Sequence, residues 1–179
     1  TFMAKPFAES SGNGLHIHIS VYDADGNNIF VEPGSTQTPP LNDTMRHAIG
    51  GLAAIMPECQ AIFAPNANSY RRLQPGTYAP LSANWGYNHR GVSLRIPVSD
   101  PQNLRIEHRV AGADANPYLV MASILIGVHY GLTHKCEPGP YIAPGTWMGE
   151  EEITLAINWL HALERFEAGT VLPQYFGED

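Results

Sequence analysis

The chain is poor in cysteine, in positive charge and in long apolar runs. Its two cysteines, Cys59 and Cys136, form neither a disulfide framework nor a zinc-binding spacing, which fits a reducing, cytoplasmic environment. Lys and Arg together number 10 against 17 Asp and Glu, which gives a formal net charge of −7. This acidic balance argues against nucleic acids and anionic membranes as partners. No apolar run predicts a membrane-spanning helix.

Positive charge is scarce, yet it is concentrated in one stretch, residues 68–109. Six of the chain's 10 Lys and Arg residues lie there, and all six are arginines: Arg71, Arg72, Arg90, Arg95, Arg105 and Arg109. A local arginine cluster in an acidic protein predicts a focused positive field for a small anionic ligand. Arginine also favours planar, bidentate recognition of carboxylate or phosphate.

The charged residues of this stretch alternate with apolar ones. In LRIEHR, the polar positions 105, 107 and 109 alternate with Ile106 and His108. Successive strand residues point to opposite faces of a sheet, so this segment is predicted to be a strand with one charged face. Two interpretations stay open from the pattern alone. The charged face is either a solvated surface with weak ion pairs or a binding cleft.

A second alternating segment carries two histidines. His16 and His18 alternate with Leu15, Ile17 and Ile19, and a predicted turn over residues 23–28 leads to a returning strand. Two histidines on the polar face of one strand occur in metal sites. Without other observations, two half-exposed histidines remain the simpler interpretation.

The remaining patterns predict helices joined by loops. We expect a helix over residues 43–56, a break or kink at Pro57, and a further turn over 59–63. A nearly all-apolar helix is predicted over 117–132, and a last helix over 150–168. The predicted fold class is therefore α+β, with a mixed or antiparallel sheet whose polar face is free and whose back is covered by about three helices.

Several motifs, taken in order, resemble the glutamine synthetase family over nearly the whole chain. They are KP at 5–6, GNGLHIH at 12–18, IGGL at 49–52, NSYRRL at 68–73 with PG and AP at 75–80, RIP at 95–97, RIEHR at 105–109 and ANPYL at 115–119. The resemblance implies that residues 1–179 are the second half of a catalytic domain built on a curved, largely antiparallel sheet with helices on its back. It implies further that the amino-terminal domain and the first half of the catalytic domain are absent, and that the whole protein is a homo-oligomer, a double hexameric ring.

The family reaction has two steps. ATP phosphorylates the side-chain carboxylate of glutamate, and ammonia or an amine then attacks the acyl phosphate. The chemistry requires fixed positive charge and a divalent metal, Mg²⁺ or Mn²⁺. The resemblance therefore names ATP, glutamate and an amine as the small-molecule partners, with ATP as co-substrate.

The resemblance also implies roles for individual residues. Two residues match metal ligands of the family: His16 and Glu107. Five match positions at the nucleotide: His18, Ser20, Arg90, Arg95 and Arg105. Four match the site of glutamate and the incoming acceptor: Gly12, Arg72, Tyr78 and Arg109. Three of the arginines match catalytic positions: Arg72, Arg90 and Arg109.

Two positions depart from the ammonia-using members. Ser11 replaces an asparagine in the loop that touches glutamate, and Tyr78 replaces the glutamate that binds ammonium and removes its proton. The departure at Tyr78 favours a primary amine or a polyamine as the acceptor. An ammonia-using glutamine synthetase that tolerates Tyr78 and a non-catalytic member acting as a binding or structural protein are the alternatives. Because the other metal ligands of the family are glutamates upstream of Thr1, we expect this chain alone to be inactive.

Overall fold

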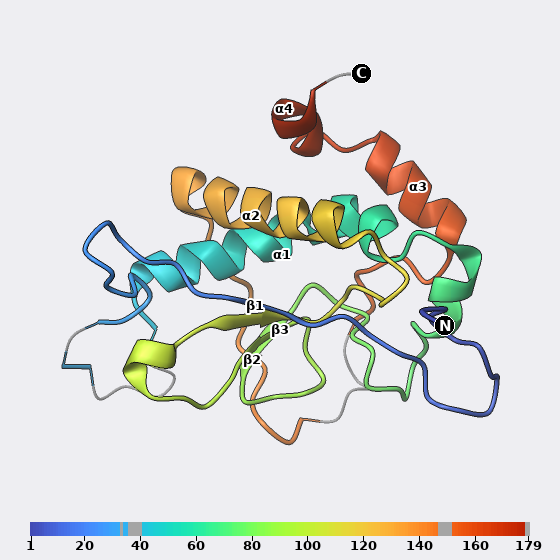
Figure 1. Cartoon of the computed structure of the whole chain (residues 1–179), viewed down its shortest axis with the longest axis horizontal. Coiled ribbons are helices and arrows are strands. Elements are labelled where there is room, and N and C mark those ends of the chain that lie inside the picture. Colours follow the sequence, from blue (N-terminus) through green and yellow to red (C-terminus); the bar gives the residue numbers. More distant parts are fainter. Residues whose placement is uncertain (33, 36–40, 147–151, 178–179) are drawn as a thin grey trace.

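The computed structural model of the chain describes residues 1–32, 34–35, 41–146 and 152–177. It has two layers, a four-stranded sheet and a pair of long helices that cover one of its faces (Figure 1). The strands are β1 (Ile17–Ile19), β2 (Trp85–Tyr87), β3 (Leu94–Ile96) and β4 (Ile106–His108), and they lie in the order β1-β4-β3-β2. β4 is antiparallel to both β1 and β3, while β2 and β3 are parallel. The predicted α+β class and the largely antiparallel sheet are confirmed.

Strand β1 pairs with β4, and not with the segment that follows the turn over residues 23–28. The predicted hairpin is therefore reduced to the turn itself, which is closed by a bridge between Tyr22 and Asn28 and by a 2.9 Å bond from Ile29 N to Val21 O. Short 3₁₀ helices, η1 (Ala67–Arg71) and η2 (Pro101–Asn103), precede β2 and β4. Among the described residues, no helix has the length and apolar character to cross a membrane.

Helix α1 (Asp43–Phe63) begins where the side chain of Asn42 accepts a bond from the backbone N of Met45. It runs through Pro57 as one helix, so of the predicted break or kink at that residue the break is wrong. A proline inside a helix costs about 3 kcal/mol. Met56, just before it, and Cys59, two residues after it, are fully buried, and their burial offsets that cost.

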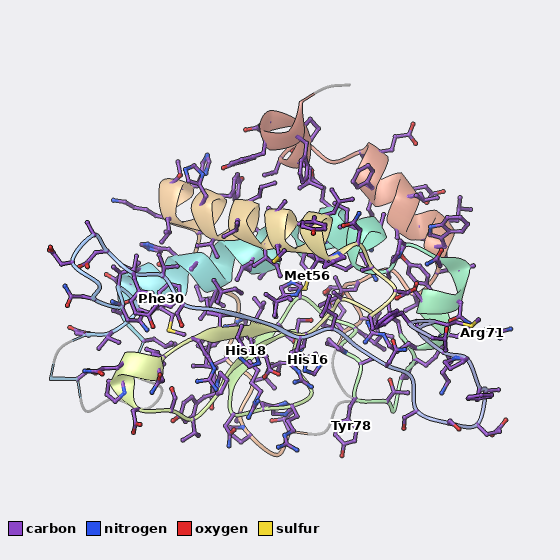
Figure 2. All side chains as sticks on the ribbon, in the orientation of Figure 1. His16, His18, Phe30, Met56, Arg71 and Tyr78 are labelled. Carbon is purple, nitrogen blue, oxygen red and sulfur yellow. The ribbon has the colours of Figure 1, made fainter. Side chains whose placement is uncertain are left out.

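Helix α2 (Pro117–His134) confirms the predicted apolar helix, with Asn116 as its N-cap and Pro117 at its first position. Its inner face packs on α1, and the inner faces of both helices and the sheet form one apolar core. Phe30 and Met56, labelled in Figure 2, belong to this core. The core fixes the back of the sheet, so that the opposite face is free to carry polar side chains.

The last helices differ from the prediction. Helix α3 (Trp159–Glu167) begins at its N-cap Asn158, not near residue 150, and α4 (Leu172–Phe176) follows it. Residues 150–151 lie outside the described residues, and residues 152–158 are not helical. Their backbone groups are bonded elsewhere, because Leu155 N donates to Leu81 O and Ala156 exchanges two bonds with the side chain of Gln60. These contacts with other parts of the chain outweigh the helical preference of the sequence.

Candidate active site

The pairing of β1 with β4 brings the predicted metal ligands together. His18 lies directly opposite Glu107 in the register of the two strands. His16 Nδ1 lies 3.0 Å from Glu107 Oε1, and His18 Nε2 lies 3.9 Å from the same oxygen. Both histidines are half-exposed, on the sheet face that the helices leave free (Figure 2). His16 and Glu107, which the resemblance matches to metal ligands, therefore lie in direct contact.

Glu107 is a buried carboxylate held by two arginines. Arg95 Nη1 donates to its Oε2 at 2.8 Å, and Arg109 Nη1 donates to its Oε1 at 2.9 Å. Burial by itself would raise the pKa of this carboxyl, but the bond from Arg95 and the charges of Arg109 and Arg95 outweigh burial and hold the pKa below its usual value. Glu107 is therefore ionised near neutral pH.

The imidazole of His16 is kept neutral by the same surroundings. Burial and the neighbouring charge of Arg109 lower the pKa of His16, against the opposing effect of Glu107. A neutral imidazole beside an ionised carboxylate provides two donors of the kind that divalent metals accept. No cluster of three or more His, Cys, Asp or Glu in the described part of the chain could hold a metal. The pair thus fits part of a metal site, to which substrate phosphates or further ligands would have to be added.

The two arginines on Glu107 also reach a neighbouring turn with their other guanidinium nitrogens. Arg95 Nη2 donates to Asn88 Oδ1 at 2.8 Å, and Arg109 Nη2 donates to the backbone oxygen of Arg90 at 2.8 Å. Arg95 and Arg109 therefore hold one buried carboxylate, and each also bonds the turn that carries Arg90. Because the carboxylate is buried and both arginines are bonded on two sides, these ion pairs differ from the weak pairs of a solvated surface.

Other predicted residues form a separate group at the far end of β1. Arg105 Nε donates to His18 Nδ1 at 3.1 Å, and Arg105 Nη1 donates to Asn103 O at 2.9 Å. Ser20 Oγ donates to Leu104 O at 3.1 Å. Arg71, which shares the sequence cluster, is exposed and lies at the edge of the molecule, away from His16 and His18 (Figure 2). The six arginines that lie close together in the sequence are therefore distributed over several places in the fold.

A cavity of about 640 Å³ lies beside His16. Arg72 and Arg109 line it, together with the glycine-rich loop over residues 10–14. Arg72 is buried, and its Nη2 donates to Val110 O. A Cβ added at Gly12 would lie 2.7 Å from Ala4 O and 3.0 Å from Arg72 Cγ, so only glycine lets the loop approach this arginine.

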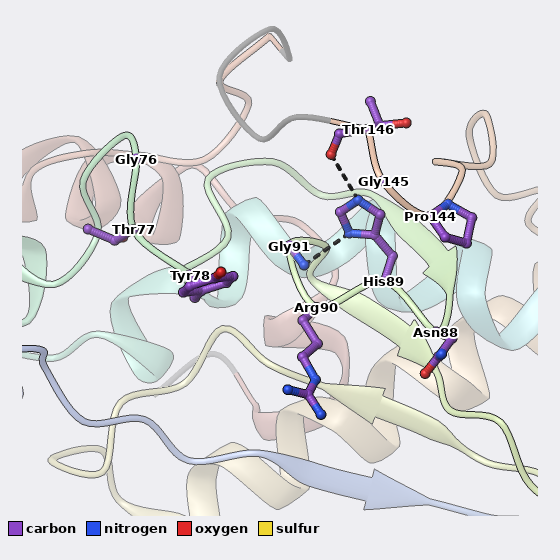
Figure 3. A pocket seen from close by; sticks show the side chains of 10 residues that line it. All are labelled: Gly76, Thr77, Tyr78, Asn88, His89, Arg90, Gly91, Pro144, Gly145 and Thr146. Atoms are coloured by element: carbon purple, nitrogen blue, oxygen red, sulfur yellow. Dashed lines mark hydrogen bonds between the residues drawn. The ribbon is translucent and has the colours of Figure 1, made fainter.

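Tyr78 lines this cavity and also a second one of about 330 Å³, which Figure 3 shows. The second cavity is lined by residues 76–78, 88–91 and 144–146. The Tyr78 side chain is 78% exposed, so its ring is available to a ligand in either cavity. One lining residue, His89, was not predicted as a site residue. In the sequence, the signal for His89 is its place next to Arg90. Its contact with Thr146 joins residues 57 positions apart, so no local pattern predicts it.

The chain is similar to known proteins over its whole length. Residues 1–179 match the family model of the glutamine synthetase catalytic domain. The chain is 44% identical to the γ-glutamylputrescine synthetase of Escherichia coli over 99% of its own length and 37% of that protein. It is 38% identical to a glutamine synthetase of Pyrococcus abyssi, over 99% of the chain and 41% of that protein. Among solved structures, ligand-free GmaS superposes with a TM-score of 0.85 at 34% identity, covering 99% of the chain and 41% of GmaS. The chain thus spans about two fifths of the length of these relatives.

Proposed function

Because the chain belongs to the glutamine synthetase family, we propose that the protein containing it is an ATP-dependent ligase for glutamate and an amine. The ligase joins the γ-carboxylate of glutamate to a primary amine or polyamine through a γ-glutamyl phosphate. The observation that carries the choice of acceptor is the position of Tyr78, at the boundary between the cavity beside His16 and the second cavity. We propose further that this chain is part of the catalytic domain and that the whole protein is a homo-oligomer, a double hexameric ring.

Arg72, Arg109 and Gly12 would bind glutamate in the larger cavity. The two guanidinium groups are oriented before the ligand arrives, since Arg72 is bonded to Val110 O and Arg109 to Glu107. Each also keeps a buried Nε–H without a partner among the described residues. Preoriented positive charge binds the carboxylate and stabilises the charge that develops on the transferring phosphoryl group. The role of these arginines is to hold and orient, since phosphoryl transfer requires mainly positioning and charge.

Arg90 and Arg95 would bind the phosphates of ATP, and His18, Ser20 and Arg105 would contact the rest of the nucleotide. The two groups lie at different places along the sheet, as an extended nucleotide would require. His16 and Glu107 would hold a divalent ion, Mg²⁺ or Mn²⁺, which neutralises phosphate charge when bound. Arg95 links these functions, because its guanidinium bonds Glu107 with one nitrogen and the turn before Arg90 with another.

The acceptor is assigned from the chemistry of Tyr78. An ammonium ion needs a carboxylate that binds it and takes its proton, because only the neutral amine attacks an acyl phosphate. A phenol is uncharged near neutral pH and cannot replace that carboxylate. Its ring can instead cover the methylene groups of an alkylamine, while its hydroxyl makes one hydrogen bond. The second cavity, of about 330 Å³, which Tyr78 also lines, offers space for the remainder of such an amine.

The test compares acceptors in the full-length enzyme. We expect kcat/KM for putrescine, spermidine or a simple monoamine to exceed that for ammonia. Tyr78→Glu should move the ratio toward ammonia by about 10-fold, because it restores the missing carboxylate. Tyr78→Phe is the matched control and should keep the preference for amines, since the ring remains. Ammonia as the best acceptor of the wild type would leave an ordinary glutamine synthetase, and no turnover with any acceptor would favour a non-catalytic member.

A further inference from the structure

The turn over residues 88–91, which carries Arg90, is held on its sheet side by the arginines that bind Glu107. Asn88 has a left-handed φ of +52°, and its Oδ1 accepts from Arg95 Nη2 at 2.8 Å. The backbone oxygen of Arg90 accepts from Arg109 Nη2, also at 2.8 Å. These two bonds fix one side of the turn to the sheet.

The opposite side of the turn is held by His89. Its ring is 7% exposed and lies between the turn and residues 144–146 (Figure 3). His89 Nδ1 accepts from Gly91 N at 3.0 Å, and His89 Nε2 lies 3.1 Å from Thr146 O. A carbonyl oxygen can only accept, so Nε2 carries the proton and Nδ1 is bare. One neutral tautomer therefore satisfies both contacts.

The segment that His89 reaches is itself anchored to the sheet. Ile142 N donates to Trp85 O at 3.0 Å, so residues 142–146 begin beside β2 and end at the His89 ring. A Cβ added at Gly86 would lie 2.6 Å from Ile142 O and 3.2 Å from His89 Cβ, which shows how closely this segment, β2 and the histidine pack. The ring is therefore a bridge between two walls of the second cavity.

We propose that His89 is a positioning residue, which fixes the direction of Arg90 and joins the turn over 88–91 to residues 144–146. The side chains of His89 and Arg90 point to opposite sides of the turn, His89 toward Thr146 and Arg90 toward the sheet (Figure 3). Because the turn is bonded on both sides, the backbone of Arg90 is held in place, and this fixes the point from which its side chain extends. The inference rests on the proposed function only in that Arg90 is taken to bind the phosphates of ATP.

Three substitutions in the full-length protein separate the two contacts of the ring. His89→Asn keeps an acceptor for Gly91 N but is too short to reach Thr146. His89→Gln keeps a donor that reaches toward Thr146 but loses the acceptor at the Nδ1 position. His89→Ala removes both. Because Gly91 is adjacent to Arg90, we expect kcat/KM for ATP to fall about 10-fold in His89→Ala and His89→Gln, and His89→Asn to recover most of the loss. KM for glutamate should change little, since Arg72 lies in the other cavity.

A double-mutant cycle with Arg90→Ala distinguishes positioning from general destabilisation. If His89 acts through Arg90, His89→Ala adds no further loss in kcat/KM for ATP once Arg90 is alanine. Additive losses, or a His89→Ala enzyme with wild-type kinetics, would overturn the proposal.

Hydrogen exchange at the Gly91 amide provides a readout that needs no catalysis. The amide should be protected in the wild type and in His89→Asn, and should exchange faster in His89→Gln and His89→Ala. If the wild type shows no ligase activity, the proposed function fails, and this exchange pattern alone decides whether His89 holds the turn. Equal protection in all four proteins would reject the inference.

Discussion

Replacing Gly131 with alanine tests how closely α1 and α2 approach each other. The two helices meet through glycines, with Gly51 on α1 facing Gly127 and Gly131 on α2. A Cβ added at Gly131 would lie 2.1 Å from the backbone oxygen of His47 and 2.9 Å from Gly51 Cα, whereas ordinary contact begins near 3.4 Å. The atoms it would meet belong to the backbone of the other helix, so no side chain can rotate away to make room.

The size of the effect follows from this geometry. To reach 3.4 Å from the His47 oxygen, the helices would have to separate locally by about 1.3 Å. Overpacking of this kind costs roughly 1–3 kcal/mol, and occasionally more. A gap of that width also weakens the contacts of neighbouring side chains such as Leu52 and Ile124, which share the core. Alanine regains about 1 kcal/mol through its higher helix propensity. Because the clash is with backbone, we take the upper end of that range, about 3 kcal/mol, and expect a net loss of about 2 kcal/mol in the free energy of unfolding, or about 4–8 °C in Tm for a chain of this length.

Urea unfolding followed by circular dichroism measures this loss. Gly139→Ala is the matched control, because a Cβ there meets nothing within 4 Å and the residue has no left-handed φ. It should change the free energy of unfolding by less than about 0.5 kcal/mol. A Gly131→Ala protein as stable as the wild type would refute the close backbone contact between α1 and α2.

Two further stability predictions concern buried polar groups. Burial lowers the pKa of His108 from 6.5 to about 3, so the unfolded chain binds a proton that the folded chain rejects. As the pH falls from 6.5 to about 3, the free energy of unfolding should decrease by at most about 1.4 kcal/mol per pH unit. His108→Leu should make the urea midpoint depend less on pH. Gln60→Leu leaves both bonds to the Ala156 backbone unmade, each 2.6 Å long in the wild type. It should cost about 2–4 kcal/mol and speed proteolysis near residue 156, while the exposed Gln74→Leu stays within about 0.5 kcal/mol.

The polar face of the sheet was predictable from the sequence because short half-buried strands keep a strict period of two. Glu107 lies among charged groups and His108 lies against Phe63, with ring centroids 4.7 Å apart, as their alternate positions predict. The two-residue period alone does not predict that His16 lies beside Glu107. That prediction followed from the resemblance to a known family, since nothing in the local pattern fixes which strands are neighbours.

Features set by contacts between distant parts of the chain were missed. The start of α3 was placed near residue 150 because three glutamates favour a helix N-terminus there, whereas Gln60 and Leu81 bind residues 155–156 in a non-helical form. His89 was missed for a related reason, since its partner Thr146 lies 57 residues away. Local propensity is a weak predictor wherever backbone groups find partners outside their own segment.

The separation in sequence between β1 and β4 has a consequence for the order of folding. Arg109 and His16, whose side chains meet beside Glu107, are 93 residues apart, whereas β2 and β3 are joined by a short connection. Closing a long loop costs more entropy than closing a short one, and distant pairings form slowly. The helices and the β2–β3 pair can therefore form early, while the His16–Glu107 pair requires the most distant pairing of the sheet. A chain in which β1 has not yet docked can have most of its secondary structure, but it lacks the contact between His16 and Glu107.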